Sequence, residues 1–189
     1  QLIRENNQRA GKTWTWEDDG GGKITCKKEY AYTTGELGEV LDTVVYTYGD
    51  DSWGDLLTGY NGATITYDEL GNPLNDGTWT YTWERGRQLA SMSDGTTTWT
   101  YTYDADGMRT SRTNGTRTYN YTYNGSQLSR MTVDGHTLDF SYDASGRPLS
   151  VTYDGTPYFY VLSLQGDVMA ILDSSGTAVV SYTYSAYGS

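Results

Sequence analysis

The chain has 189 residues, of which 19 are tyrosine and 6 are tryptophan, and its net charge is −11. A surface this acidic disfavours binding to nucleic acid and to anionic lipid, because contact with phosphates would bring like charges together. Cys26 is the only cysteine, so an internal disulfide and a thiolate metal cluster are excluded, and no apolar run is long enough to span a membrane. The chain begins with Gln1 and has no apolar leader, so we expect an interior piece of a longer protein.

The first sixty-odd residues are the least regular part of the sequence. Residues 14–24 look like a degenerate hairpin with a glycine-rich turn, and residues 44–48 are a plausible strand. Residues 51–57 could form a short helical turn capped by Asp51 or Ser52, although a glycine inside it weakens that prediction. No segment keeps a helical period over three turns, so the sequence predicts an all-β chain.

Glycine turns recur with a fixed spacing in the rest of the chain. Asp-Gly or Asn-Gly pairs begin 18, 20, 20 and 20 residues apart, at positions 76, 94, 114, 134 and 154. A second series of glycine turns falls between them, at positions 71, 86, 107, 125 and 146. Such residues supply the positive φ angles that tight hairpin turns require. The chain is therefore expected to turn about every ten residues, alternately at two ends.

Rings and threonines alternate between these turns. The segments 78–83, 98–103 and 118–123 each place tryptophan or tyrosine at every second position, with threonine or asparagine between. A period of two with aromatic and β-branched residues is typical of strands that show different chemistry on their two faces. We therefore expect antiparallel β-hairpin repeats in a thin sheet, with rings on one face and threonines on the other.

Each repeat closes with a similar phrase, in which tyrosine and aspartate precede a glycine turn. Full copies begin at Tyr67, Tyr103 and Tyr142, and shorter ones begin at Trp83 and Tyr123. The aspartate side chain can bond to the backbone two residues on, the glycine turns the chain, and an apolar residue enters the next strand.

This phrase at a twenty-residue spacing resembles the YD repeats of Rhs, wall-associated and toxin-complex proteins and of the teneurins. Residues 166–188 look like the Rhs-associated core segment of that family. The resemblance covers about residues 12–189 and is strongest from Thr64 onward. The sequence departs from the pattern at Asp18, where the family has tyrosine, and at Ser185, where it often has aspartate and a turn bond could be missing.

The resemblance implies a long sheet wound into a hollow shell that encloses a cargo polypeptide. In the family, the core segment lies just upstream of a self-cleaving region and a variable toxin. No self-cleaving residue is carried over, because those motifs lie downstream of the core segment and this sequence stops at Ser189. It further implies a secreted or cell-surface bacterial protein whose partners are the rest of the shell and a C-terminal toxin or effector.

Three sections are expected within one continuous structural unit. Residues 1–63 hold an irregular part with degenerate repeats, residues 64–163 hold the regular repeats, and residues 164–189 hold the core segment. The predicted function is structural, with no enzymatic activity, no catalytic residue and no cofactor. Unpaired outer strands of such a sheet could also associate between copies of the chain.

The alternative is a module that binds glycans or a cell surface through its rings. Trp79, Trp83 and Trp99 are the residues that could stack on sugars or contact a partner, if their face is open. Packing of the rings against each other across strands is the explanation that the residues favour. Which face looks inward is left open, and it decides whether rings or threonines meet a partner.

Metal and acid–base chemistry have weak signals. Asp104 and Asp106 resemble the start of a calcium loop, but the remaining ligands are absent, so a metal site is not predicted. His136 is the only histidine and follows a turn, so an exposed histidine without a catalytic role is expected.

Overall fold

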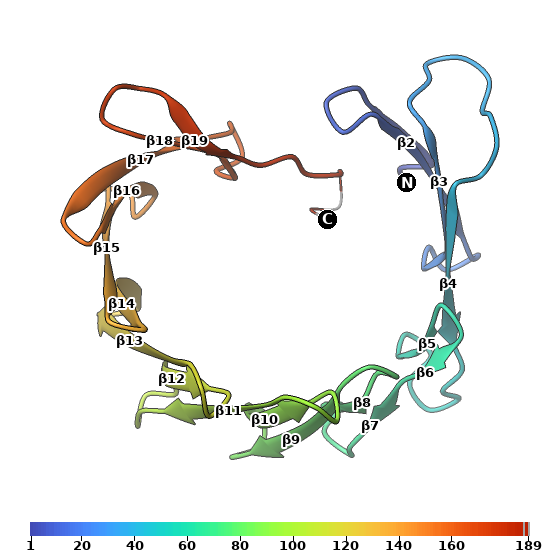
Figure 1. Cartoon of the computed structure of the whole chain (residues 1–189). Helices are drawn as coiled ribbons and strands as arrows, with labels where there is room; N and C mark the ends of the chain where they lie inside the picture. Colours follow the sequence, from blue (N-terminus) through green and yellow to red (C-terminus); the bar gives the residue numbers. More distant parts are fainter. Residues whose placement is uncertain (187, 189) are drawn as a thin grey trace. The chain divides into compact units, whose positions relative to one another are not determined.

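The structure, a computed structural model, describes residues 1–186 and 188, and every element in that part is a β-strand. The chain divides into two compact units (Figure 1). The first contains residues 1–81 together with the C-terminal residues from Thr183 on, and the second contains residues 82–182. No helix long and apolar enough to cross a membrane is present among the described residues.

The first unit holds a six-stranded antiparallel sheet in which the strands follow their order in the sequence. Its strands are β1 (Arg4–Asn7), β2 (Lys12–Asp18), β3 (Ile24–Ala31), β4 (Asp42–Tyr48), β5 (Leu57–Tyr60) and β6 (Ala63–Thr64). The hairpin of β7 (Thr66–Tyr67) and β8 (Pro73–Asn75) follows, and β8 pairs with the first residue of β9 (Thr80–Glu84).

The buried part of the first unit lies around β2. Thr13 is fully buried, and Trp14, Trp16 and Tyr30 are 8%, 5% and 7% exposed. Trp14 Nε1 donates a 3.0 Å hydrogen bond to Glu29 Oε2, so the polar edge of the buried indole has a partner. β2, which supplies three of these four residues, lies between β1 and β3 in the sheet.

The turn at residues 51–57 and its capping residue both differ from the prediction made from the sequence. The helical turn expected at residues 51–57 is wrong: the segment is a non-helical turn, and Leu57 begins β5. Its cap is Asp50, whose Oδ1 accepts the backbone N–H groups of Ser52 and Trp53 at 2.8 and 2.6 Å. The Leu56 N–H then donates to the Trp53 carbonyl at 2.9 Å, and the chain enters β5 at the next residue, before a helix can continue.

The C-terminal segment packs against β1 within the same unit. Asn7 Nδ2 donates to the carbonyl of Tyr184 at 3.0 Å, and the backbone N–H of Ala186 donates to Glu5 Oε2 at 2.7 Å. Ser185, between them, is 7% exposed. These polar contacts hold residues 184–186 on side chains that β1 presents.

The second unit is a run of antiparallel strands that also pair in sequence order, each joined to the next by a short turn (Figure 1). After β9 its strands are β10 (Gln88–Ser93), β11 (Thr98–Tyr103), β12 (Arg109–Thr113), β13 (Thr118–Asn124), β14 (Gln127–Val133), β15 (His136–Tyr142), β16 (Pro148–Tyr153), β17 (Thr156–Leu162), β18 (Val168–Leu172) and β19 (Ala178–Ser181).

The two faces of this unit carry different side chains, as the alternation predicts. Tyr101 lies opposite Arg112, which lies opposite Tyr119, while Thr102 lies opposite Ser111. We call the first side the ring face, and its members in β9–β13 are Trp83, Met92, Trp99, Tyr101, Tyr103, Arg109, Arg112, Tyr119, Tyr121 and Tyr123. The opposite side is the threonine face. Hydroxyl groups bond across it, as between Thr102 and Ser111 at 2.7 Å.

The second unit has almost no fully buried core. Val151, at 6% exposed, is its one buried hydrophobic residue, and most rings of the ring face are only half-buried. A single layer of strands gives this result, because half-wet positions suit tyrosine, whose ring is apolar and whose hydroxyl is polar. The all-β fold of antiparallel hairpins is therefore confirmed.

Candidate functional site: the repeat turns and the ring face

The tyrosine–aspartate phrase has a consistent geometry. Asp104 Oδ1 accepts the backbone N–H groups of Asp106 at 3.0 Å and Met108 at 2.9 Å. The preceding Tyr103 hydroxyl donates to the carbonyl of Leu89, fourteen residues earlier, at 3.0 Å. The aspartate therefore holds its own turn, while the tyrosine attaches that turn to the previous repeat. The same two interactions recur at Tyr67–Asp68 and Tyr142–Asp143.

Asp104 allows a test of the turn with a neighbouring control. Asp104→Ala removes the acceptor of two backbone N–H groups, so we expect the free energy of unfolding to fall by about 1–2 kcal/mol. Asp106→Ala alters an exposed carboxylate in the same turn and should change it by no more than about 0.5 kcal/mol. Urea unfolding of both variants, followed by circular dichroism, checks the difference. Equal losses would contradict a capping role for Asp104.

The turns at the other end of the hairpins are of two kinds. Asp94 Oδ1 accepts the N–H groups of Thr96 and Thr97 at 2.8 and 2.7 Å, and the turns at Asp76 and Asn114 do the same. The N–H bonds from Thr97 and Thr96 lower the pKa of the Asp94 carboxyl. Its stabilising contribution is therefore present at neutral pH and is lost as the pH falls through that lowered pKa.

The turns at Asp134 and Asp154 are tighter than these. Both aspartates adopt positive φ angles, 52° and 46°, and each is followed by a glycine at 84°. Two consecutive residues with positive φ form the two-residue hairpin turn whose twist matches that of the flanking strands.

His136 takes part in a structural contact at one of these turns. Its Nδ1 lies 2.6 Å from Asp154 Oδ2, and its ring stacks on Tyr153 with centroids 5.4 Å apart. Its side chain is 51% exposed, which confirms the expected exposure. No group of three or more metal-ligating side chains occurs in the part of the chain that the structure describes.

The three candidate tryptophans belong to both units. Trp79 belongs to the first unit and closes the turn at Asp76, whose N–H donates to the Trp79 carbonyl at 3.1 Å. Trp83 and Trp99 belong to the second unit and lie on the ring face of β9 and β11. All three are half-buried. The side chains of Trp83 and Trp99 therefore share a face of the second unit, and Trp79 belongs to the first unit.

Two arginines complete the ring face, and reasoning from the sequence missed them. Arg112 Cζ lies 4.1 Å from the ring centroid of Tyr119 and 5.1 Å from that of Trp99. Arg109 Cζ lies 5.0 Å from Tyr121 and 5.7 Å from its other ring neighbour, Tyr101. Guanidinium groups stack well on aromatic rings. The sequence could have indicated these arginines, because residues 109–113 have arginine at positions where the neighbouring strands have aromatic residues.

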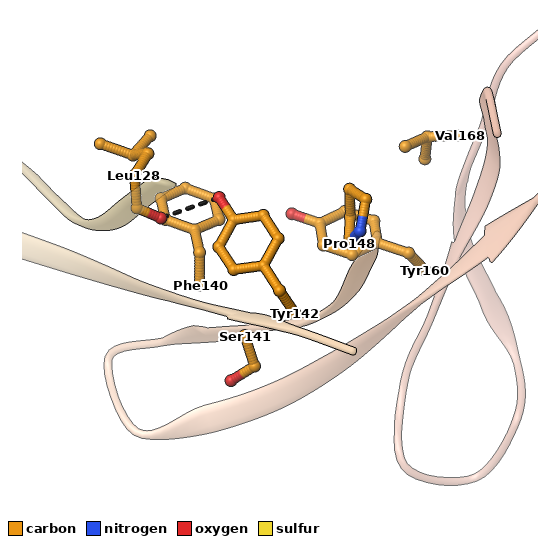
Figure 2. Close-up of a pocket in the computed structure, with 7 residues that line it drawn as sticks. All are labelled: Leu128, Phe140, Ser141, Tyr142, Pro148, Tyr160 and Val168. Atoms are coloured by element: carbon orange, nitrogen blue, oxygen red, sulfur yellow. Dashed lines mark hydrogen bonds between the residues drawn. The ribbon is translucent and has the colours of Figure 1, made fainter. Parts of the chain in front are cut away.

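An apolar hollow of about 230 Å³ lies further along the ring face, between β14 and β18. The Tyr142 hydroxyl reaches the Leu128 carbonyl at 2.8 Å beside it, as Figure 2 shows. Leu128, Phe140, Ser141, Tyr142, Pro148, Tyr160 and Val168 line it (Figure 2). The Tyr142 hydroxyl is already hydrogen-bonded to the Leu128 carbonyl, and most of the other lining side chains are apolar. The hollow is therefore suited to an apolar side chain rather than to catalysis.

Comparison with known proteins gives relatives in two groups. No family model matches the chain. The tRNA3(Ser)-specific nuclease WapA of Bacillus spizizenii is 37% identical over 146 residues, and the tRNA nuclease WapA of Bacillus subtilis is 36% identical over 139 residues. Each match covers 70% of this chain and 6% of the relative.

Two solved toxin structures share the fold. The Tc holotoxin pore of Photorhabdus luminescens matches with a TM-score of 0.60 and 16% identity over 94% of this chain and 10% of that one. The TcdB2–TccC3 complex without its hypervariable C-terminal region matches with a TM-score of 0.52 and 15% identity, with the same coverage.

The tyrosine–aspartate turns and the WapA matches lead to one family. The chain belongs to the YD-repeat, or Rhs, family. It spans 6% of the length of its WapA relatives, and therefore corresponds to a small section of such a protein.

Ser163 and Ser185 stand where the YD phrase has aspartate, and the turn forms at both positions. At Ser163 a hydroxyl replaces the carboxylate, and its Oγ accepts the N–H groups of Gln165 and Asp167 at 3.2 and 3.1 Å. These bonds are longer than those of Asp104, as expected for a shorter and neutral acceptor. At Ser185 the turn still closes through its backbone, because the Gly188 N–H donates to the Ser185 carbonyl at 2.9 Å.

Proposed function

We propose that this YD-repeat chain is a structural section of a shell in a longer secreted or cell-surface bacterial protein. The shell holds or encloses a toxin or effector carried at the C-terminal end of that protein. The chain itself performs no catalytic step in this proposal, and its partners are the neighbouring repeats and the enclosed polypeptide.

The observation that supports this proposal is the match to WapA over a region made only of hairpin repeats. WapA proteins are named as nucleases, whereas the matched residues here are strands and turns whose polar groups are engaged in holding those turns. A single-layer sheet with one buried hydrophobic residue in its larger unit also suits a wall better than an enzyme core.

Protease protection of the complete protein tests the enclosure. Within the intact protein, the polypeptide that follows the YD repeats should be cut much more slowly than the same polypeptide expressed alone. A variant that opens the sheet, such as Trp14→Ala, should restore rapid cutting. Equal cutting rates for the enclosed and the isolated polypeptide would contradict the proposal. Reading the residues that follow Ser189 is a cheaper check, since self-cleavage motifs and a divergent tail are expected there.

Glycan binding through Trp79, Trp83 and Trp99 has weaker support. Sugars stack on open ring faces, but the face of Trp99 that turns towards β12 is taken by Arg112. A glycan array decides this alternative, and binding above background that is lost in Trp83→Ala would favour it.

A further inference from the structure

The arginines of the ring face differ from Arg117 and Arg130 in what they contact. Arg130 makes a two-point ion pair with Asp139 on the threonine face, at 2.6 and 3.1 Å, and Arg117 pairs with Asp134 at 2.6 Å. Arg109 and Arg112 contact rings, and no carboxylate lies within ion-pair distance of either in the described structure. Rings, and no carboxylate, are thus the described partners of Arg109 and Arg112.

Most acidic residues of the second unit lie in its turns and not in its strands. Only two acidic residues lie within the strand segments of the second unit, Glu84 and Asp139. Asp139 lies opposite Arg130, and Glu84 alternates with Trp83, so both point to the threonine face. The other carboxylates of this unit lie in its turns. Within the strands, Arg109 and Arg112 are therefore the charged side chains of the ring face over β11–β13. The nearest turn carboxylates, those of Asp104 and Asp106, line a hollow with Tyr121 and Tyr123.

The rings hold the two guanidinium groups in place. Arg112 lies on β12 between Trp99 of β11 and Tyr119 of β13, and those two rings have centroids 6.1 Å apart. The Nε of Arg112 is shielded from solvent and has no hydrogen-bond partner in the described structure. Stacking fixes the guanidinium plane and leaves the edge formed by the two Nη groups, rather than the shielded Nε, for an anion. Little side-chain entropy therefore remains to be lost when the anion binds.

We infer that Arg109 and Arg112 form a binding site for the carboxylates of an acidic polypeptide segment that lies across β11–β13. A guanidinium edge pairs with a carboxylate through two parallel N–H···O bonds, and the flanking tyrosine rings receive the aliphatic part of the partner side chain. A nucleic acid is disfavoured by the overall charge. A polysaccharide would need open ring faces, which Arg112 occupies. The inference holds whether or not the chain encloses a toxin, so its test and that of the proposed function fail separately.

Peptide titration tests the site with matched peptides and matched variants. A short peptide alternating glutamate and serine is titrated into the chain at about 0.15 M salt, where screening over roughly 8 Å weakens repulsion from the acidic turns. The same peptide with glutamine for glutamate is the neutral comparison. We expect the glutamate peptide to bind at least about fivefold more tightly than the glutamine peptide, since two exposed charge pairs contribute that much.

The double variant Arg109→Gln with Arg112→Gln should lose that advantage. Arg130→Gln removes an arginine from the opposite face and should retain it. Addition of the glutamate peptide should also shift the Nε–Hε resonances of Arg109 and Arg112 in the unaltered chain, a result that does not depend on how the variants fold. The inference is overturned if those resonances do not move, if the double variant binds as the unaltered chain does, or if polygalacturonate binds while the glutamate peptide does not.

Discussion

Trp14→Ala should lower the free energy of unfolding of the first unit by about 3–5 kcal/mol, the range for removing a buried large aromatic side chain. Trp14 is 8% exposed, its Nε1 is bonded to Glu29, and Lys27 Nζ lies 5.4 Å from its ring centroid. Alanine would leave a cavity beside β2 and would leave Glu29 with one donor fewer. Both effects act in the same direction.

The comparison residue for this experiment is Trp53, which has the same chemistry but is 50% exposed. Trp53→Ala should cost roughly half as much or less, because half of its surface is already in water. Trp14→Phe keeps most of the buried area and loses only the hydrogen bond, so an intermediate loss of about 1–2 kcal/mol is expected. Urea unfolding followed by far-ultraviolet circular dichroism measures all three. If Trp14→Ala costs no more than Trp53→Ala, β2 is not the centre of the core.

The repeating part of the fold follows from local sequence. The alternating segment at 98–103 has the same bounds as β11, and the one at 118–123 falls within β13. Alternation and turn type are properties of a few neighbouring residues, so a single sequence specifies them. Asp104 was identified from the same local logic, and its two backbone hydrogen bonds confirm the predicted mechanism.

The arrangement of the ring face depends on strand register, which local sequence does not specify. The register shifts between Thr102 and Tyr103, and again between Thr122 and Tyr123, so that a bulge accompanies the tyrosine of each repeat. These shifts decide that Arg112, rather than another residue of β12, lies between two rings. Bulges of this kind also bend and twist the sheet.

Contacts between distant parts of the chain are beyond any periodic pattern. The bonds from Asn7 to Tyr184 and from Ala186 to Glu5 join residues 177 and 181 positions apart. The surroundings of Trp14 are equally non-local, since its register partners are Glu5 of β1 and Glu29 of β3. From residues alone, Trp14 and Trp79 look alike, yet one is a core residue and the other closes a half-exposed turn.

Gly77→Ala should destabilise the first unit by about 2–6 kcal/mol, the sum of a backbone cost and a steric cost. The φ angle of Gly77 is 91°, and a side chain in that region costs about 1–3 kcal/mol. A Cβ added there would also stand 2.4 Å from the Cβ of Ala63, which is fixed directly to the backbone of β6 and cannot rotate away. Relief of that overlap requires a backbone shift, for which a further 1–3 kcal/mol is typical, roughly doubling the cost.

Gly95 separates the two costs, because it occupies the same kind of turn. Its φ angle is 86°, the preceding aspartate accepts the same pair of N–H groups, and an added Cβ would meet no atom within 4 Å. Gly95→Ala should therefore show the backbone cost alone. Adding Ala63→Gly to Gly77→Ala should recover the steric part, and a double-mutant cycle measured by urea unfolding isolates it. If Gly77→Ala and Gly95→Ala cost the same and the cycle gives no coupling, β6 does not pack against this turn, and the hairpins of the first unit would be held by their strand pairing alone.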